Sequence, residues 1–151
     1  MDSIEFFLAH AIQLEFEAAR RYEDLRSAMQ TAGNQEAEQF FKRMAEYSRR
    51  HLQEAMRRGG FREIPKLAAD EWQWPDGVSP EQAAWHGVDG FIEEADAYRL
   101  ALDGEERSQL FYAAICAETT DPEVRRMARE FAEEEAEHVQ ALEALMGRKA
   151  A

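Results

Sequence analysis

Apolar residues recur at three- and four-residue steps along four long stretches of the chain, with charged residues between them. This spacing places the apolar side chains on one face of an α-helix. The pattern therefore predicts helices over residues 3–32, 35–58, 91–118 and 122–146.

Short breaks separate the first predicted helix from the second, and the third from the fourth. Gly33 is a helix stop and Asn34 is a good N-cap for the next helix. Asp121 can cap the fourth helix, and Pro122 suits its first helical position. Gly147 is expected to end that helix.

A long connection is expected over residues 59–90. Its first part, residues 61–79, has no helical period and carries two tryptophans, Trp72 and Trp74, which we expect to hold it against the helices. A Ser-Pro-Glu helix-start signal begins at Ser79 and predicts a short helix broken by glycines.

Two short links and one long connection define the predicted topology. The helices should form two antiparallel hairpins, and the long crossover makes the second and third helices parallel. This is the arrangement of ferritin-like four-helix bundles. The sequence therefore predicts an all-α, ferritin-like four-helix bundle, with residues 1–151 as a single domain.

Composition excludes several classes of function. The net charge of −13 disfavours nucleic acid and anionic membranes as partners. The N-terminus lacks the basic region of a signal peptide, and no apolar run is long enough to cross a bilayer. Cys116 is the only cysteine, so a Cys-rich metal centre cannot form. We expect a cytoplasmic protein.

The chemistry centres on Glu135-x-x-His138 in the fourth predicted helix. Side chains three positions apart share one helix face, so this carboxylate and imidazole can reach one ion. The second helix resembles the fourth after a shift of 87 residues, which places His51 on His138 but Ser48 on Glu135.

The first helix resembles the third after a shift of 90 residues. Glu15 then falls on Glu105, and Tyr22 falls on Tyr112. The stripe around Glu15 is otherwise apolar, so these carboxylates should face inward. A buried carboxylate is costly unless something compensates its charge.

A shared pair of metal ions would provide that compensation. Di-iron carboxylate bundles take one Glu from each of two helices and Glu-x-x-His from each of the other two. The mixture of carboxylate and imidazole favours iron, with manganese or zinc as alternatives. The expected ligands are Glu15, His51, Glu105, Glu135 and His138.

Three segments resemble the rubrerythrin family of the ferritin-like superfamily: residues 11–18 followed by Tyr22, residues 44–51, and residues 131–138. The resemblance implies a diiron centre that reacts with oxygen or peroxide, and it assigns the same five ligands. Rubrerythrins proper also have a Cys-rich, rubredoxin-like iron module, which a single cysteine cannot build.

Two serines depart from the family pattern. Ser48 replaces the glutamate of one Glu-x-x-His pair, and Ser108 replaces an additional carboxylate three residues after Glu105. Two divalent ions bring a charge of +4, against −3 from the three remaining carboxylates. We therefore expect an asymmetric site, tight at Glu105, Glu135 and His138 and looser at Glu15 and His51. Glu54 is a less favoured substitute for the absent carboxylate.

The function expected is that of an oxidoreductase that oxidises Fe(II) with oxygen or scavenges peroxide, with a separate electron donor that the sequence does not identify. One alternative is a metal-binding module without turnover, in which Ser48 marks a degraded site. Another is a structural bundle. A homodimer is expected through outward aromatic residues such as Phe6 and Phe41.

Other polar residues have simpler expected roles. Tyr22 and Tyr112 should lie in the core with their hydroxyls bonded to inward carboxylates. His10, on the opposite side of its helix from Glu15, is expected at the surface or at an interface. Three acidic neighbours of the Glu-x-x-His motif are expected to be solvated: Glu133, Glu134 and Glu137.

Overall fold

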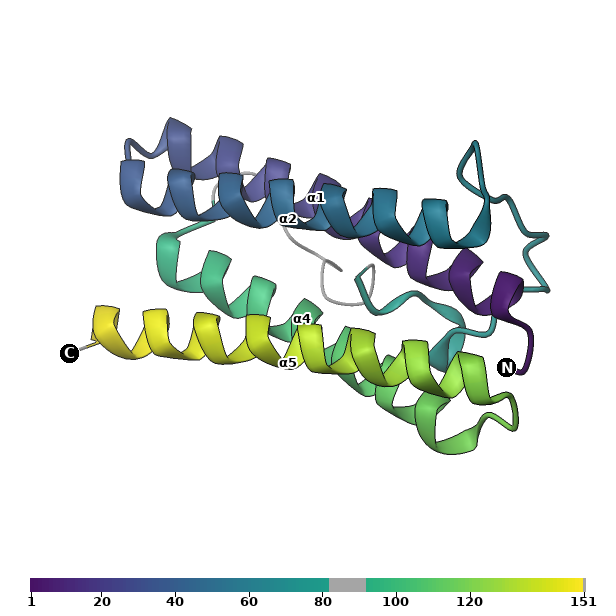
Figure 1. The fold of residues 1–151 in the computed structure, drawn as a ribbon. Coiled ribbons are helices and arrows are strands. Elements are labelled where there is room, and N and C mark those ends of the chain that lie inside the picture. The colour runs from purple at the N-terminus through teal and green to yellow at the C-terminus, as the bar shows by residue number, and fades with distance from the viewer. Residues whose placement is uncertain (82–91, 151) are drawn as a thin grey trace.

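The computed structural model describes residues 1–81 and 92–150. Four long helices dominate this part of the chain, joined by a crossover that contains one 3-10 turn, η1 (Figure 1). Within the same residues there is no β-strand. The elements are α1 (Ile4–Thr31), α2 (Gln35–Gly59), η1 (Pro75–Gly77), α4 (Glu94–Glu118) and α5 (Pro122–Ala150).

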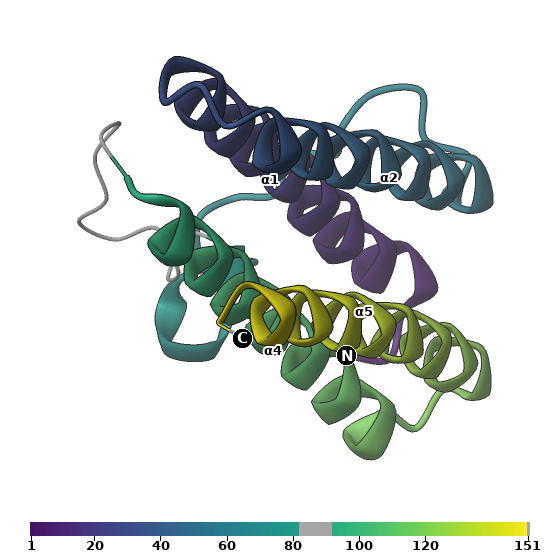
Figure 2. The same ribbon diagram turned by 90° about the vertical axis from the view of Figure 1, so that its left-hand side faces the viewer.

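The helices form two antiparallel hairpins, α1 with α2 and α4 with α5, which lie against each other in two layers (Figures 1 and 2). The crossover returns the chain along the bundle, so that α2 and α4 run in the same direction (Figure 1). The predicted all-α bundle with the ferritin-like connection is confirmed.

Capping residues fix the helix starts. The Asn34 side chain accepts a hydrogen bond from the Ala37 backbone N–H at 3.1 Å, and Asp121 Oδ1 accepts one from the Val124 N–H at 3.0 Å. Each satisfies a backbone donor that the first turn of a helix leaves without an intrahelical partner. Both predicted caps are confirmed.

The predicted end of the last helix is wrong. Helix α5 continues through Gly147 to Ala150. Glycine costs about 1 kcal/mol in a helix interior, and contacts of the last turn oppose that cost. Lys149 Nζ lies 2.8 Å from Glu36 of α2 and 3.4 Å from Glu94 of α4.

The expected short helix after Ser79 and the expected start of the third helix near Phe91 fall largely outside the described residues.

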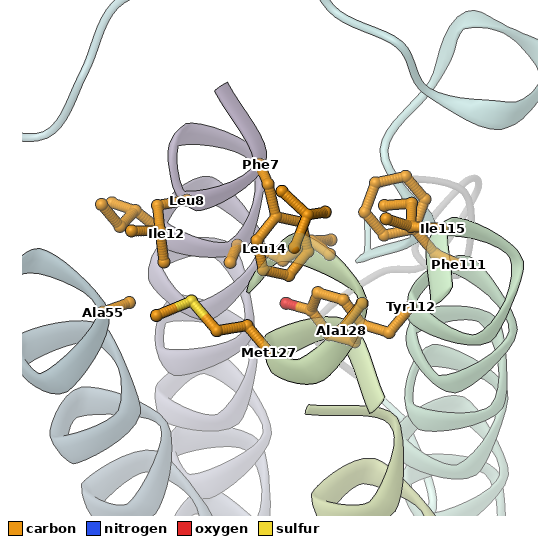
Figure 3. Close-up of a cluster of buried hydrophobic side chains, with 12 residues drawn as sticks. Phe7, Leu8, Ile12, Leu14, Ala55, Phe111, Tyr112, Ile115, Met127 and Ala128 are labelled. Carbon is orange, nitrogen blue, oxygen red and sulfur yellow. The ribbon is translucent and has the colours of Figure 1, made fainter. Parts of the chain in front are cut away.

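Two apolar clusters fill the two ends of the bundle. The cluster that Figure 3 shows contains Phe7, Leu8, Ala11, Ile12, Leu14, Ala55, Phe111, Tyr112, Ile115, Val124, Met127 and Ala128. The other contains Ala18, Tyr22, Leu25, Met29, Ala37, Phe41, Ala45, Ala97, Tyr98, Ala101, Leu142 and Leu145. On every helix the two clusters occupy different stretches, and the polar residues of the site lie between those stretches.

The tryptophans hold the crossover to the bundle, as expected, and they do so through His10. The rings of Trp72 and Trp74 lie 5.0 and 4.7 Å from the His10 ring. His10 Nδ1 lies 2.8 Å from the Phe6 carbonyl oxygen, and Nε2 accepts a hydrogen bond from the Gln73 N–H at 2.9 Å. His10 is fully buried, so the surface position expected for it is wrong.

Replacing His10 with phenylalanine should therefore destabilise the protein in a pH-dependent way. Burial lowers the pKa of His10 below its ordinary value of 6.5, and the neutral ring serves as donor and acceptor at once. His10→Phe should cost about 1–3 kcal/mol at pH 7.5, because each of two part-buried backbone groups loses a hydrogen bond. Because the pKa of His10 is lower in the folded state, its contribution to stability is fully present above pH 6.5, the unfolded-state pKa. That contribution is lost as the pH falls through the folded-state pKa. The difference in free energy of unfolding between wild type and variant, measured by urea unfolding, should therefore be smaller at pH 5 than at pH 7.5. A constant gap would contradict this role.

The aromatic residues expected to mediate dimerisation are not both available. Phe41 is completely buried, with its ring 6.2 Å from Tyr22 and 5.5 Å from Tyr98. The expectation that Phe41 points outward is wrong, because it lies on the face of α2 that packs into the second cluster.

None of the helices in the described segments is long and apolar enough to span a membrane.

Candidate metal centre

A layer of buried polar side chains lies between the two apolar clusters. All four helices contribute to it, and each of the residues below is at most 9% exposed. The layer contains Glu15 from α1, Ser48 from α2, Glu105 and Ser108 from α4, and Glu135 from α5.

The most compact part of the layer is formed by α4 and α5. Ligand-type atoms of Glu105, Glu135 and His138 all lie within 4.8 Å of one another. His138 Nδ1 is 3.2 Å from Glu105 Oε2 and 3.5 Å from Glu135 Oε2. The Tyr22 hydroxyl donates a hydrogen bond to the other oxygen of Glu105, Oε1. The structure thus brings together the three residues expected to form the tighter half of the site.

The α1 and α2 half is more open. His51 Nδ1 lies 3.5 Å from Glu15 Oε1, and its Nε2 lies 3.5 Å from Glu134 Oε2. The rings of His51 and His138 are 5.9 Å apart and close to parallel. Glu134 is half-buried against His51, so the expectation that it is simply solvated is wrong, whereas Glu133 and Glu137 are exposed as predicted.

The pKa values of the two adjacent carboxylates in the tight half, Glu135 and Glu105, are shifted in opposite directions. Burial, and then the charge of Glu105, raise the pKa of Glu135 well above its usual value. Burial opposes ionisation of Glu105 too, but hydrogen bonds from Glu135, His138 and Tyr22 leave its pKa below the ordinary value. A proton shared by this pair is therefore favoured on Glu135 rather than on Glu105.

Both histidines of the layer favour the protonated form. Burial lowers the pKa of His51, but the hydrogen bond and charge of Glu15 outweigh it and leave the pKa raised. Glu105 has the same effect on His138. In the metal-free protein, protons thus supply positive charge that a bound cation would otherwise provide.

Raised pKa values predict that the metal-free protein loses stability as the pH rises. For a group whose folded-state pKa is raised, the stabilising contribution is present below the unfolded value and is lost as the pH passes the folded one. This holds for Glu135 above 4.5 and for His51 and His138 above 6.5. Thermal melting of chelator-treated protein should therefore occur at a lower temperature at pH 8 than at pH 5.5. A melting temperature that rises over this interval would refute the assignment.

The tyrosines that border the layer match the expectation from the sequence only in part. The buried Tyr112 hydroxyl has no hydrogen-bond partner in the described structure, so its expected bond to an inward carboxylate is absent, while the bond expected for Tyr22 is present. Tyr47, which sequence reasoning did not select, lies with its ring 4.5 Å from that of His51 and 4.6 Å from that of His138.

Glu81 is a second residue that sequence reasoning missed. It belongs to the crossover, yet it is 7% exposed and lines one cavity with Ser48 and the carboxylates of the layer. Ser108 Oγ donates to Glu81 Oε1 at 3.2 Å. A Cβ on Gly104 would lie 3.1 Å from Glu81 Oε2, so glycine makes room for this carboxylate on α4. That glycine, inside a helix, is one sequence signal for Glu81.

A second cavity, of about 80 Å³, lies on the Glu15 and His51 side. Glu54 and Glu130 line it, and Arg58 bonds to both, with Nε 3.0 Å from Glu54 Oε1 and Nη2 2.7 Å from Glu130 Oε1. Glu54 is therefore held in surface ion pairs rather than turned toward the layer. The cavity has room for several water-sized molecules.

The donor set of the layer fits a pair of divalent ions. Carboxylates and imidazoles are ligands that iron, manganese and zinc all accept, and no thiolate takes part. His138 Nε2 and the Tyr112 hydroxyl are buried without a hydrogen-bond partner in the described residues. Such a concentration of buried, imperfectly paired groups is costly in a purely structural bundle.

Comparison with known proteins gives the chain a family. The family model described as Rubrerythrin matches residues 7–60, which include Glu15, Ser48 and His51. A crystal structure of an uncharacterized conserved protein from Magnetospirillum magnetotacticum MS-1 matches this chain with 37% sequence identity and a TM-score of 0.78. The match covers 97% of this chain and 95% of that protein's chain. No curated protein is similar enough to count as a match. With its four-helix fold and its carboxylate and histidine layer, the chain belongs to the rubrerythrin family of ferritin-like proteins.

Proposed function

We propose that the polar layer holds two iron ions and that the protein is an oxidoreductase that reacts Fe(II) with oxygen or peroxide. The observation that carries the proposal is the convergence of Glu105, Glu135 and His138 from two helices, with all three ligand atoms within 4.8 Å. The family assignment supports iron as the metal. Manganese and zinc suit the same donors and are distinguished by elemental analysis.

When bound, ferrous iron supplies the electrons that reduce oxygen or peroxide. The protein residues set the conditions for that reaction. Glu105 and Glu135 neutralise charge, and binding of a cation displaces the proton they share. The Tyr22 hydroxyl fixes the orientation of Glu105 through its hydrogen bond. The apolar clusters on either side exclude water from the layer.

The oxidant would reach the site from the Glu15 and His51 side. The cavity there borders both residues and leads outward between α2 and α5, past Arg58 and Glu130. Peroxide and oxygen are both small enough for a space of about 80 Å³. The tight half, by contrast, is enclosed by buried side chains.

This difference supports unequal affinities at the two metal positions. Glu105, Glu135 and His138 are preassembled and should hold the tighter ion. Glu15 and His51 offer a more open position with half-buried Glu134 nearby. Titration that gives two equally tight ions would argue against the asymmetry.

Turnover is tested by loading the chelator-treated protein with Fe(II) under anaerobic conditions and then adding air or hydrogen peroxide. Ferrous iron should disappear faster than in protein-free buffer, together with oxygen or peroxide, as followed with a ferrous chelator and an oxygen electrode. Glu105→Gln is the matched control and should slow the loss of Fe(II). Iron that is retained but oxidises no faster than in buffer would instead identify a metal-binding module without turnover.

A further inference from the structure

Glu81 is a buried carboxylate in a segment that has no regular place in a four-helix bundle. It lies in the crossover, and in the sequence it is far from each of the expected ligands. Its exposure to solvent is only 7%. Among the described residues, Ser108 Oγ at 3.2 Å is the hydrogen-bond donor to Glu81, and one hydroxyl does not compensate a full buried charge. A nearby cation would.

Its position is shared with the expected metal ligands. The cavity that Glu81 lines is also lined by Glu15, Glu105, Glu135 and His138. The carboxylate charges that act most strongly on Glu81 are those of Glu105 and then Glu15. Glu81 therefore approaches the site along α4, where it contacts Gly104 and Ser108.

The backbone of α4 is shaped to admit this side chain. A methyl group on Gly104 would come within 3.1 Å of Glu81 Oε2, which is tighter than an ordinary contact. Glycine in a helix interior is less favourable than alanine, so its presence here calls for a reason. One turn later, Ser108 places a hydroxyl on the other oxygen of Glu81. Two positions of α4 thus accommodate one carboxylate from the crossover.

Charge counting gives this carboxylate a purpose. Two divalent ions carry +4, and Glu15, Glu105 and Glu135 supply −3, because α2 has Ser48 where a fourth carboxylate is expected. Ser48 is itself buried and lines the same cavity as Glu81. An ionised Glu81 brings the total to −4.

Tyr112, which does not line this cavity, is a second buried polar side chain beside the layer. Its hydroxyl is fully buried and has no hydrogen-bond partner in the described residues. The carboxylate charges that act on it are those of Glu15, Glu135 and Glu81, in that order. Figure 3 shows the ring reaching from α4 toward the middle of the bundle.

We infer that Glu81 is the fourth carboxylate ligand of the dimetal site, supplied by the crossover in place of the residue that α2 lacks at Ser48. It completes the metal position beside Glu15 and His51. The inference rests on the metal site of the proposed function, but it does not depend on turnover.

The first test compares metal binding by wild type, Glu81→Gln and Glu17→Gln, using anaerobic Fe(II) titration with native mass spectrometry. Glutamine keeps the shape of Glu81 and removes its charge. The variant should retain one tight ion and bind the second about 10–100-fold more weakly. Glu17 is a buried glutamate of α1 that accepts hydrogen bonds from Gln13 and Ser79 and borders neither cavity. Glu17→Gln should bind both ions as wild type does.

The second test moves the carboxylate from the crossover to α2. If the two positions serve the same ion, Ser48→Glu combined with Glu81→Gln should recover the second ion that Glu81→Gln loses. Gly104→Ala provides a variant that leaves every charge in place. It should weaken the second ion by displacing the Glu81 carboxylate, while far-ultraviolet circular dichroism and thermal melting show an intact fold.

The outcomes separate this inference from the proposed function. Wild type that binds two ions, with Glu81→Gln unable to hold the second and rescue by Ser48→Glu, supports the role of Glu81. Unchanged binding of both ions by Glu81→Gln overturns it and leaves the metal site standing. Wild type that binds no ion overturns both.

Discussion

Saturating the metal-free protein with Fe(II) in the absence of oxygen is expected to raise its free energy of unfolding by about 4 kcal/mol. This is the gain for one ion at a free concentration about 1,000 times its Kd, if the unfolded chain does not bind. For a chain of this length it corresponds to an increase of about 8–16 °C in Tm. The physical reason is the metal-free layer itself, in which buried carboxylates repel one another and protons substitute for the cation.

Differential scanning calorimetry at pH 7.5, with and without Fe(II), measures this effect. Addition of a chelator in excess should return the Tm to its metal-free value. The His138→Ala variant is a suitable control, because it removes one of the three preassembled ligands and should show a much smaller increase. An unchanged Tm for wild type in saturating Fe(II) would contradict a metal-dependent layer.

Replacing Glu135 with leucine should have opposite effects on the two forms of the protein. Without metal, the variant should be more stable than wild type by about 1–3 kcal/mol, because leucine removes a polar carboxyl group that is buried without full compensation. Glu135 is 6% exposed and stands against Glu105, whose own donors Tyr22 and His138 remain in the variant. Addition of Fe(II) should increase the free energy of unfolding of the variant little or not at all.

Urea unfolding of both proteins, in chelator and in Fe(II), tests this reversal. Glu133→Leu is the matched control, since Glu133 is on the same helix but exposed. It should change stability by no more than about 0.5 kcal/mol in either condition. A metal-free Glu135→Leu protein that is less stable than wild type would indicate a structural carboxylate rather than a metal ligand. Stability given up at a functional site is a common compromise in proteins.

The helices and much of the site could be predicted because their signals are local and periodic. Glu15 and Glu105 interrupt apolar stripes, and Glu135 and His138 share one helix face, so the bundle topology alone brings them to one level. The structure indeed places Glu105, Glu135 and His138 together. Their role as ligands stays a prediction.

The residues that were missed belong to, or depend on, the crossover. No periodicity fixes where residues 61–81 lie against the helices, so the burial of Glu81 could not be predicted. The sequence predicts His10 at the surface or at an interface, because it lies on the face of its helix opposite Glu15, whereas Trp72 and Trp74 cover it in the structure. Gly104 and the missing charge at Ser48 were signals for Glu81, but each has a meaning only once the two are connected in space.

Crystals grown anaerobically with Fe(II) and measured at the iron absorption edge test the central claim most directly. The account predicts anomalous peaks inside the polar layer, one bordered by Glu105, Glu135 and His138 and a second near Glu15 and His51. Anomalous peaks confined to the acidic surface, with none between the two apolar clusters, would contradict it.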